Sequence, residues 1–119
     1  MRAVRLSGLV SAGLLLSLLA AQAQNPSPDE RRRVQAAKLA GLAGFVNLEC
    51  PDLRSDPARL KQTVEALGVD AASLETGDLH LIATRYIETY RKDVAANCRK
   101  AEETFGPRGS VIPGLIVPR

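Results

Sequence analysis

Aromatic side chains are scarce in this 119-residue chain, which contains two Phe, two Tyr and no Trp. Bases and sugar rings are commonly bound by stacking on aromatic side chains, so this scarcity argues against most nucleic-acid and carbohydrate-binding surfaces. The local motifs of catalysis are also missing: there is no G-x-G-x-x-G, phosphate loop, H-E-x-x-H or calcium loop. We therefore expect no enzyme, no catalytic residue, no cofactor and no metal site, although an enzyme built from distant residues stays open.

Histidine is almost absent, since His80 is the only one. A single imidazole with no second ligand or nucleophile nearby in the sequence is typical of a surface residue. Tyr86 and Tyr90 are one helical turn apart, and they either pack at the rim of the core or line a ligand site.

Long hydrophobic runs are missing except at the N-terminus, where residues 6–20 are mostly apolar. Spanning a bilayer takes roughly 20 apolar residues, and this run is shorter and interrupted by Ser and Gly. Arg2 and Arg5 precede it, and the small-x-small tripeptide at 21–23 follows it, as in a secretory signal peptide covering residues 1–23. We expect cleavage before Gln24 and a soluble periplasmic or secreted product without stable membrane insertion; an uncleaved anchor is the alternative.

No strong charge of one sign remains once the leader is removed. The 16 basic side chains fall to 14 without Arg2 and Arg5, against 13 acidic ones. This balance argues against a general nucleic-acid binder. The densest positive cluster is Arg31, Arg32 and Arg33, which either contacts anionic lipid headgroups or an acidic partner, or forms a solvated helix face.

Only two cysteines are present, Cys50 and Cys98, and an even pair in an exported chain predicts a disulfide. There is no C-x-x-C for redox exchange, and two thiols with one histidine do not make a zinc site. In the chain-entropy model a bridge across this separation stabilises the fold by roughly 4 kcal/mol.

The remaining chain predicts an all-α fold: a single small helical domain over 24–119, with three main helices, a short helical turn and an extended Pro-rich tail joined by the disulfide. The predicted segments are helix 27–49, helix 57–67, short turn 71–75, long helix 78–105 and extended tail 106–119.

Local signals mark the ends of these helices. Ser27 and Glu30 have the spacing of a capping box, with Pro28 at the first helical position. Ala and Gly residues keep the surface of helix 27–49 thin, which lets neighbouring helices approach closely. Asp56 or Ser55 suits the N-cap of helix 57–67. Gly68 suits the position after this helix, where Val69 can fold back as its apolar partner. Residues 52–56 are expected to form a short loop.

The longest predicted helix rests on an apolar stripe that stays in phase at 100° per residue from Leu79 to Phe105. We interpret it as one helix, and a bend near Lys92 and Asp93 stays open. Alternation around His80 makes a strand over 79–82 the alternative. Gly106 and Pro107 end the helix.

The C-terminal tail carries five large apolar side chains that something must cover, namely Val111, Ile112, Leu115, Ile116 and Val117. Prolines prevent it from being helical, and Pro113-Gly114 suits the centre of a type II turn. The tail either packs back over the helices to complete the core, or is offered to a partner by strand addition or groove docking.

The export signal, the all-helical pattern and the separation of Cys50 and Cys98 resemble the small acid-activated periplasmic chaperones of the HdeA type, over the region between the two cysteines. The resemblance implies a homodimer that loosens in acid and shields unfolding client proteins with exposed apolar surface.

These observations predict an exported, non-enzymatic binding or interaction protein of the bacterial cell envelope, with an envelope protein as its partner. One alternative is an acid- or stress-responsive periplasmic chaperone. The other is a small-ligand carrier or minor enzyme, which would need a large apolar pocket around Tyr86, Tyr90 and His80.

Overall fold

Helices make up most of the chain in the computed structural model, which describes residues 25–119. The predicted leader and its cleavage site before Gln24 lie outside the described residues. No helix within residues 25–119 is both long and apolar enough to cross a bilayer.

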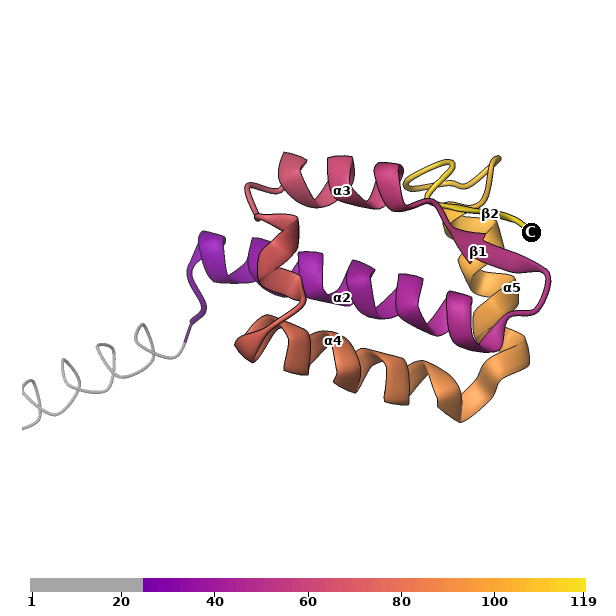
Figure 1. Cartoon of the computed structure of the whole chain (residues 1–119), viewed down its shortest axis with the longest axis horizontal. Coiled ribbons are helices and arrows are strands. Elements are labelled where there is room, and N and C mark those ends of the chain that lie inside the picture. Colours follow the sequence, from indigo (N-terminus) through magenta and orange to yellow (C-terminus); the bar gives the residue numbers. More distant parts are fainter. Residues whose placement is uncertain (1–24) are drawn as a thin grey trace, which may run out of the picture. The chain divides into compact units, whose positions relative to one another are not determined.

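The elements confirm the predicted all-α class with its disulfide, and add one small sheet (Figure 1). The helices are α2 (Pro28–Glu49), α3 (Pro57–Ala66), α4 (Gly77–Tyr90) and α5 (Val94–Phe105), with short 3-10 turns η1 (Ala71–Leu74) and η2 (Arg91–Asp93). The strands are β1 (Leu53–Ser55) and β2 (Ile116–Pro118).

Helix ends form where the local signals predict them. The Ser27 hydroxyl accepts a hydrogen bond from the Glu30 amide at 3.1 Å, and the Asp56 carboxylate accepts from the amides of Ala58 and Arg59. These acceptors satisfy amides that have no partner within the helix. After α3, Gly68 has φ +81°, and the Val69 amide donates to the carbonyl of Val64.

This arrangement after α3 is a Schellman motif, in which the chain reverses at a left-handed glycine. Val69 folds back and is buried with Val64 in the first of two core clusters. That cluster joins small residues of α2 to α3, η1 and α4; its buried members are Ala36, Ala37, Val64, Val69, Leu74, Leu79 and Ala83.

The helices α2 and α4 approach closely at Gly41. A Cβ atom placed there would lie 2.6 Å from the carbonyl oxygen of Ala83 and 2.8 Å from the Cβ of Tyr86. Only glycine fits at this contact, so the small residues of α2 set the distance between the two helices, as predicted.

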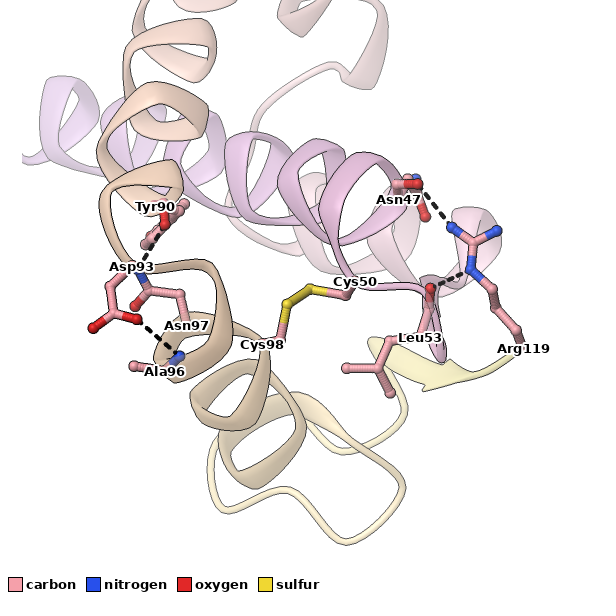
Figure 2. Close-up of a disulfide and its surroundings, with 9 residues drawn as sticks. All are labelled: Asn47, Cys50, Leu53, Tyr90, Asp93, Ala96, Asn97, Cys98 and Arg119. Atoms are coloured by element: carbon pink, nitrogen blue, oxygen red, sulfur yellow. Dashed lines mark hydrogen bonds between the residues drawn. A yellow bond between two sulfur atoms is a disulfide. The ribbon is translucent and has the colours of Figure 1, made fainter.

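The second core cluster surrounds the disulfide. Cys50 at the end of α2 bonds to Cys98 in α5, with Cα atoms 5.7 Å apart (Figure 2). The buried members are Leu42, Phe45, Val46, Cys50, Leu53, Ala101 and Ile116. This bond confirms the predicted pairing. The disulfide and the cluster around it hold α5 and β2 against the C-terminal end of α2.

The prediction of one helix over 78–105 is wrong in its continuity, because η2 separates α4 from α5 at Lys92 and Asp93, where the sequence leaves a bend open. Asp93 leaves the helical conformation with φ −148° and ψ 83°, and its carboxylate accepts from the amide of Ala96 at 3.2 Å. The Asn97 side chain donates to the carbonyl of Tyr90 at 2.8 Å (Figure 2). Asp93 therefore acts as an N-cap inside the predicted helix, a position that Asp favours over the helix interior. The alternative strand over 79–82 is also wrong, since these residues belong to α4.

Two further corrections concern the sheet. The predicted loop 52–56 contains β1, and the predicted extended tail is extended only in β2, after a series of turns. The strands pair antiparallel, with Arg54 opposite Val117. Three-residue strands give too little alternation to be recognised from sequence.

Candidate functional site

The C-terminal segment folds back on the end of α5. The amide of Ser110 donates to the Glu103 carbonyl at 3.3 Å, and the amide of Val111 donates to the Thr104 carbonyl at 3.1 Å. These carbonyls belong to the last turn of a helix and have no partner within it, so the segment satisfies them. The predicted turn is present: Gly114 has φ +81°, and the Leu115 amide donates to the Ile112 carbonyl.

Arg119 fastens the end of the chain to α2 and β1. Its Nη2 donates to the Asn47 carbonyl and its Nε to the Leu53 carbonyl, each at 2.7 Å (Figure 2). The Arg119 amide also donates to the carbonyl of Asp52 at 3.0 Å. Because Asn47 lies in the last turn of α2, the guanidinium meets the negative end of the helix dipole. Sequence reasoning missed this contact.

The Asn47 side chain supports the same corner. Its Oδ1 accepts from the amide of Ser55 and its Nδ2 donates to the Ser55 hydroxyl, both at 2.9 Å. The only signal in the sequence was that Asn47 is one of two polar residues in the apolar stretch 36–48.

An open groove of about 630 Å³ lies between α2, α5 and the folded-back segment. Its walls are one face of each helix, at the i, i+3, i+4, i+7 spacing. From α2 come Gln35, Lys38, Leu39 and Leu42; from α5 come Asn97, Lys100, Ala101, Thr104 and Phe105; Leu67, Tyr90, Val111 and Ile112 complete the lining. The lining is mostly apolar, and it includes two lysines but no Asp or Glu.

An aromatic cluster borders the groove. The rings of Tyr90 and Phe45 are 5.6 Å apart, and those of Tyr90 and Tyr86 are 6.2 Å apart. The Lys38 ammonium lies 5.7 Å from the centre of the Tyr86 ring. Burial raises the pKa of Tyr90, and the nearby Tyr86 raises it further. Because a tyrosine hydroxyl is already protonated at neutral pH, this shift acts only in the alkaline range.

A small-ligand carrier or minor enzyme would need a large apolar pocket around Tyr86, Tyr90 and His80, and the groove does not combine these three residues. Of these three, only Tyr90 lines the groove. His80 is exposed on α4, and Tyr86 packs between Tyr90 and Lys38. The i, i+4 spacing of the two tyrosines placed them side by side, but the groove opens on the side of α5.

The five apolar tail residues divide into two groups. Leu115 and Ile116 are fully buried, with no exposed surface, and Val117 is half-buried. Val111 is 63% exposed, and it lines the groove together with Ile112. A partner could therefore reach the first two only after the segment undocks, whereas Val111 and Ile112 already border a concave surface.

The basic cluster Arg31, Arg32 and Arg33 lies exposed in the first turns of α2 and does not line the groove. In the part of the chain that the structure describes, no three His, Cys, Asp or Glu side chains are placed to hold a metal ion. The two charged residues that sequence reasoning missed are Lys38 and Lys100, because an exposed helical lysine has no distinguishing local signal.

Comparison with protein-family models, curated protein sequences and solved structures found no match to this chain. The resemblance to HdeA-type chaperones therefore stays a prediction.

Proposed function

We propose that the chain is exported, loses residues 1–23 and works in the cell envelope as a non-enzymatic binding protein, with the groove between α2 and α5 as its binding site. The observation that carries the proposal is the groove itself. Its volume of about 630 Å³ lies within the roughly 300–1,000 Å³ of small-molecule sites. Its mostly apolar lining with a few polar groups is also typical of such sites.

Two features support the location. The Cys50–Cys98 disulfide suits an oxidising compartment, because cytosolic thiols are normally kept reduced. The N-terminal 23 residues have the order of charged, apolar and small residues that export requires.

Fractionation of the native host followed by intact-mass measurement tests the proposed export and cleavage. We expect a periplasmic or secreted chain beginning at Gln24 with both thiols oxidised. Intact Met1–Arg119 with free thiols would contradict it.

Binding in the groove is tested with the neutral dye Nile red, whose emission changes in apolar surroundings. We expect saturable binding to the purified protein at neutral pH. Thr104→Trp should remove it, because Thr104 is half-buried in the groove wall and the indole would fill the space. Arg99→Trp places the same indole on an exposed position of α5 outside the groove and is the matched control. Dye binding that survives Thr104→Trp in a folded protein would show that the groove is not the site.

A further inference from the structure

We propose that the groove binds a single-chain anionic amphiphile, a monomeric carboxylate with a long hydrocarbon chain, and that Lys38 and Lys100 hold its carboxylate. This inference rests on the proposed function and specifies the ligand. It follows from the charge of the lining, from the placement of the two lysines and from the size of the groove.

The lining has charge of one sign only. Lys38 and Lys100 are its charged members, and no Asp or Glu lines it, although the chain contains 13 acidic residues. Within residues 25–119, neither lysine forms an ion pair with a carboxylate. An anionic group at the rim would gain charge-assisted hydrogen bonds from these two ammonium groups. A neutral ligand would gain no such contact, and a cation would be repelled.

The two lysines stand on opposite walls of the groove. Lys38 projects from α2, where the Tyr86 ring borders its ammonium at 5.7 Å, and Lys100 projects from α5. Each precedes an apolar lining residue, Leu39 and Ala101 respectively. Long lysine side chains keep their charge at the water-accessible rim while their stems cover apolar surface. The arrangement therefore offers an apolar floor for a hydrocarbon chain with two ammonium groups at the rim.

The size of the groove favours a small molecule over a protein partner. It is lined by 13 residues, whereas a stable protein–protein interface takes roughly 20–30 residues from each side. Its volume suits a ligand of ordinary small-molecule size. A membrane surface is a different source of anionic lipid, and it is a separate arm of the test.

The test displaces bound Nile red from the same purified protein with three probes of equal chain length. These are dodecanoate, dodecan-1-ol and dodecyltrimethylammonium, all below micelle-forming concentrations. We expect dodecanoate to compete about ten-fold more strongly than the alcohol, as one charge-assisted contact allows. The cationic probe should compete least. Equal competition by dodecanoate and the alcohol would overturn the inference.

Lysine variants locate the charge effect. Lys38→Gln and Lys100→Gln should each weaken dodecanoate competition about three-fold and leave the alcohol unchanged. Lys92→Gln removes an exposed lysine that does not line the groove, and it should change neither probe. If Lys92→Gln weakens dodecanoate as much as the two groove variants do, the site assignment is wrong.

A substitution pair at Val111 keeps the test informative if a lysine variant is unstable. Val111 is already 63% exposed, so Val111→Glu and Val111→Lys cost the fold little and differ in charge. The glutamate should weaken dodecanoate competition relative to the lysine. Equal behaviour of the two variants would contradict an electrostatic site.

The outcomes separate this inference from the proposed function. Nile red binding that requires the groove, with no preference for the carboxylate, supports a binding protein and overturns the anionic ligand. Failure of Nile red to bind at all removes both. Sedimentation with phosphatidylglycerol vesicles should carry down no more protein than phosphatidylcholine vesicles do. Preferential sedimentation that persists in Thr104→Trp would indicate a membrane surface and overturn the monomeric ligand.

Discussion

At the scale of single residues, the close contact between α2 and α4 depends on glycine at position 41, which has no side chain. Gly41 faces the backbone carbonyl of Ala83, which cannot move without shifting α4. Gly44 lies one turn along and faces only the Cδ1 end of Ile87, where an added Cβ would be 2.9 Å away. The two glycines therefore differ in whether their neighbour can give way.

This difference predicts opposite outcomes for two identical substitutions. Gly→Ala inside a helix gains about 1 kcal/mol of helix propensity. At Gly41 the clash with backbone should outweigh this gain and destabilise the protein by about 1–3 kcal/mol, as overpacking does. At Gly44 the flexible Ile87 side chain can shift, and the change should be small or favourable. Chemical denaturation of the two variants measures both values, and equal stability of the variants would contradict the close approach.

A second residue-scale prediction concerns Tyr90. Its pKa is raised in the folded state, first by burial and then by Tyr86. The folded protein therefore holds this proton more tightly than the unfolded chain, so the associated stability is present below the ordinary tyrosine pKa and is lost as the pH rises through the raised value. Tyr90→Phe should keep the ring contacts and lose less stability over this alkaline range than the wild type.

Ultraviolet absorbance of tyrosinate during an alkaline titration checks the cause of this shift. Tyr86→Phe removes the secondary contribution, so it should lower the pKa of Tyr90 but leave it raised through burial. A Tyr90 that titrates at the ordinary tyrosine value in the folded protein would contradict its position between Phe45 and Tyr86.

At the scale of elements, the C-terminal segment completes the fold and also builds one wall of the groove. Leu115 and Ile116 fill the core, while Val111 and Ile112 border the groove. Arg119 then binds carbonyls of α2 and β1 at the end of the segment. The positions of Val111 and Ile112 therefore depend on contacts that later residues of the same segment make with the core, α2 and β1.

Removing the side chain at Arg119 should loosen this segment. Arg119→Ala deletes two charge-assisted donors, and because they are partly exposed we expect a loss of about 1–2 kcal/mol. Hydrogen exchange at the amides of β1 and β2 should accelerate, and Nile red binding should weaken. Arg108→Ala changes an exposed arginine of the same segment and is the control. Unchanged exchange in Arg119→Ala would show that the apolar contacts alone hold the tail.

Local sequence signals were sufficient to predict where some of these elements begin and end. Asp56 and Gly68 mark the ends of α3 because capping needs only neighbouring residues. Asp93 has the same capping chemistry, but the apolar stripe stays in phase through it, and periodicity therefore predicted one helix. The strands pair residues far apart in the sequence, such as Arg54 and Val117, and each is too short for a recognisable alternation.

At the scale of the whole described molecule, the groove could be predicted only in part. Val111 and Ile112 were candidates because exposed apolar residues require cover. Lys38 and Lys100 were not, since their shared position arises only when α2 and α5 face each other. That arrangement depends on the break at Asp93 and on the Cys50–Cys98 link. The sequence predicts the link, but at Asp93 it leaves open only a bend within one helix.

The disulfide should be necessary for α5 to stay packed against α2. Its closure of 48 residues limits the unfolded chain, which corresponds to about 4 kcal/mol in the chain-entropy model. Small domains have a total stability of about 5–15 kcal/mol, so Cys50→Ala/Cys98→Ala should lower the denaturation midpoint strongly. It should also release α5 from α2 and weaken Nile red binding in the groove. Urea titrations of the double variant, and of the wild type with and without reductant, measure the loss. A loss below about 1 kcal/mol would mean that the packing of the second core cluster, rather than the covalent link, holds α5 in place.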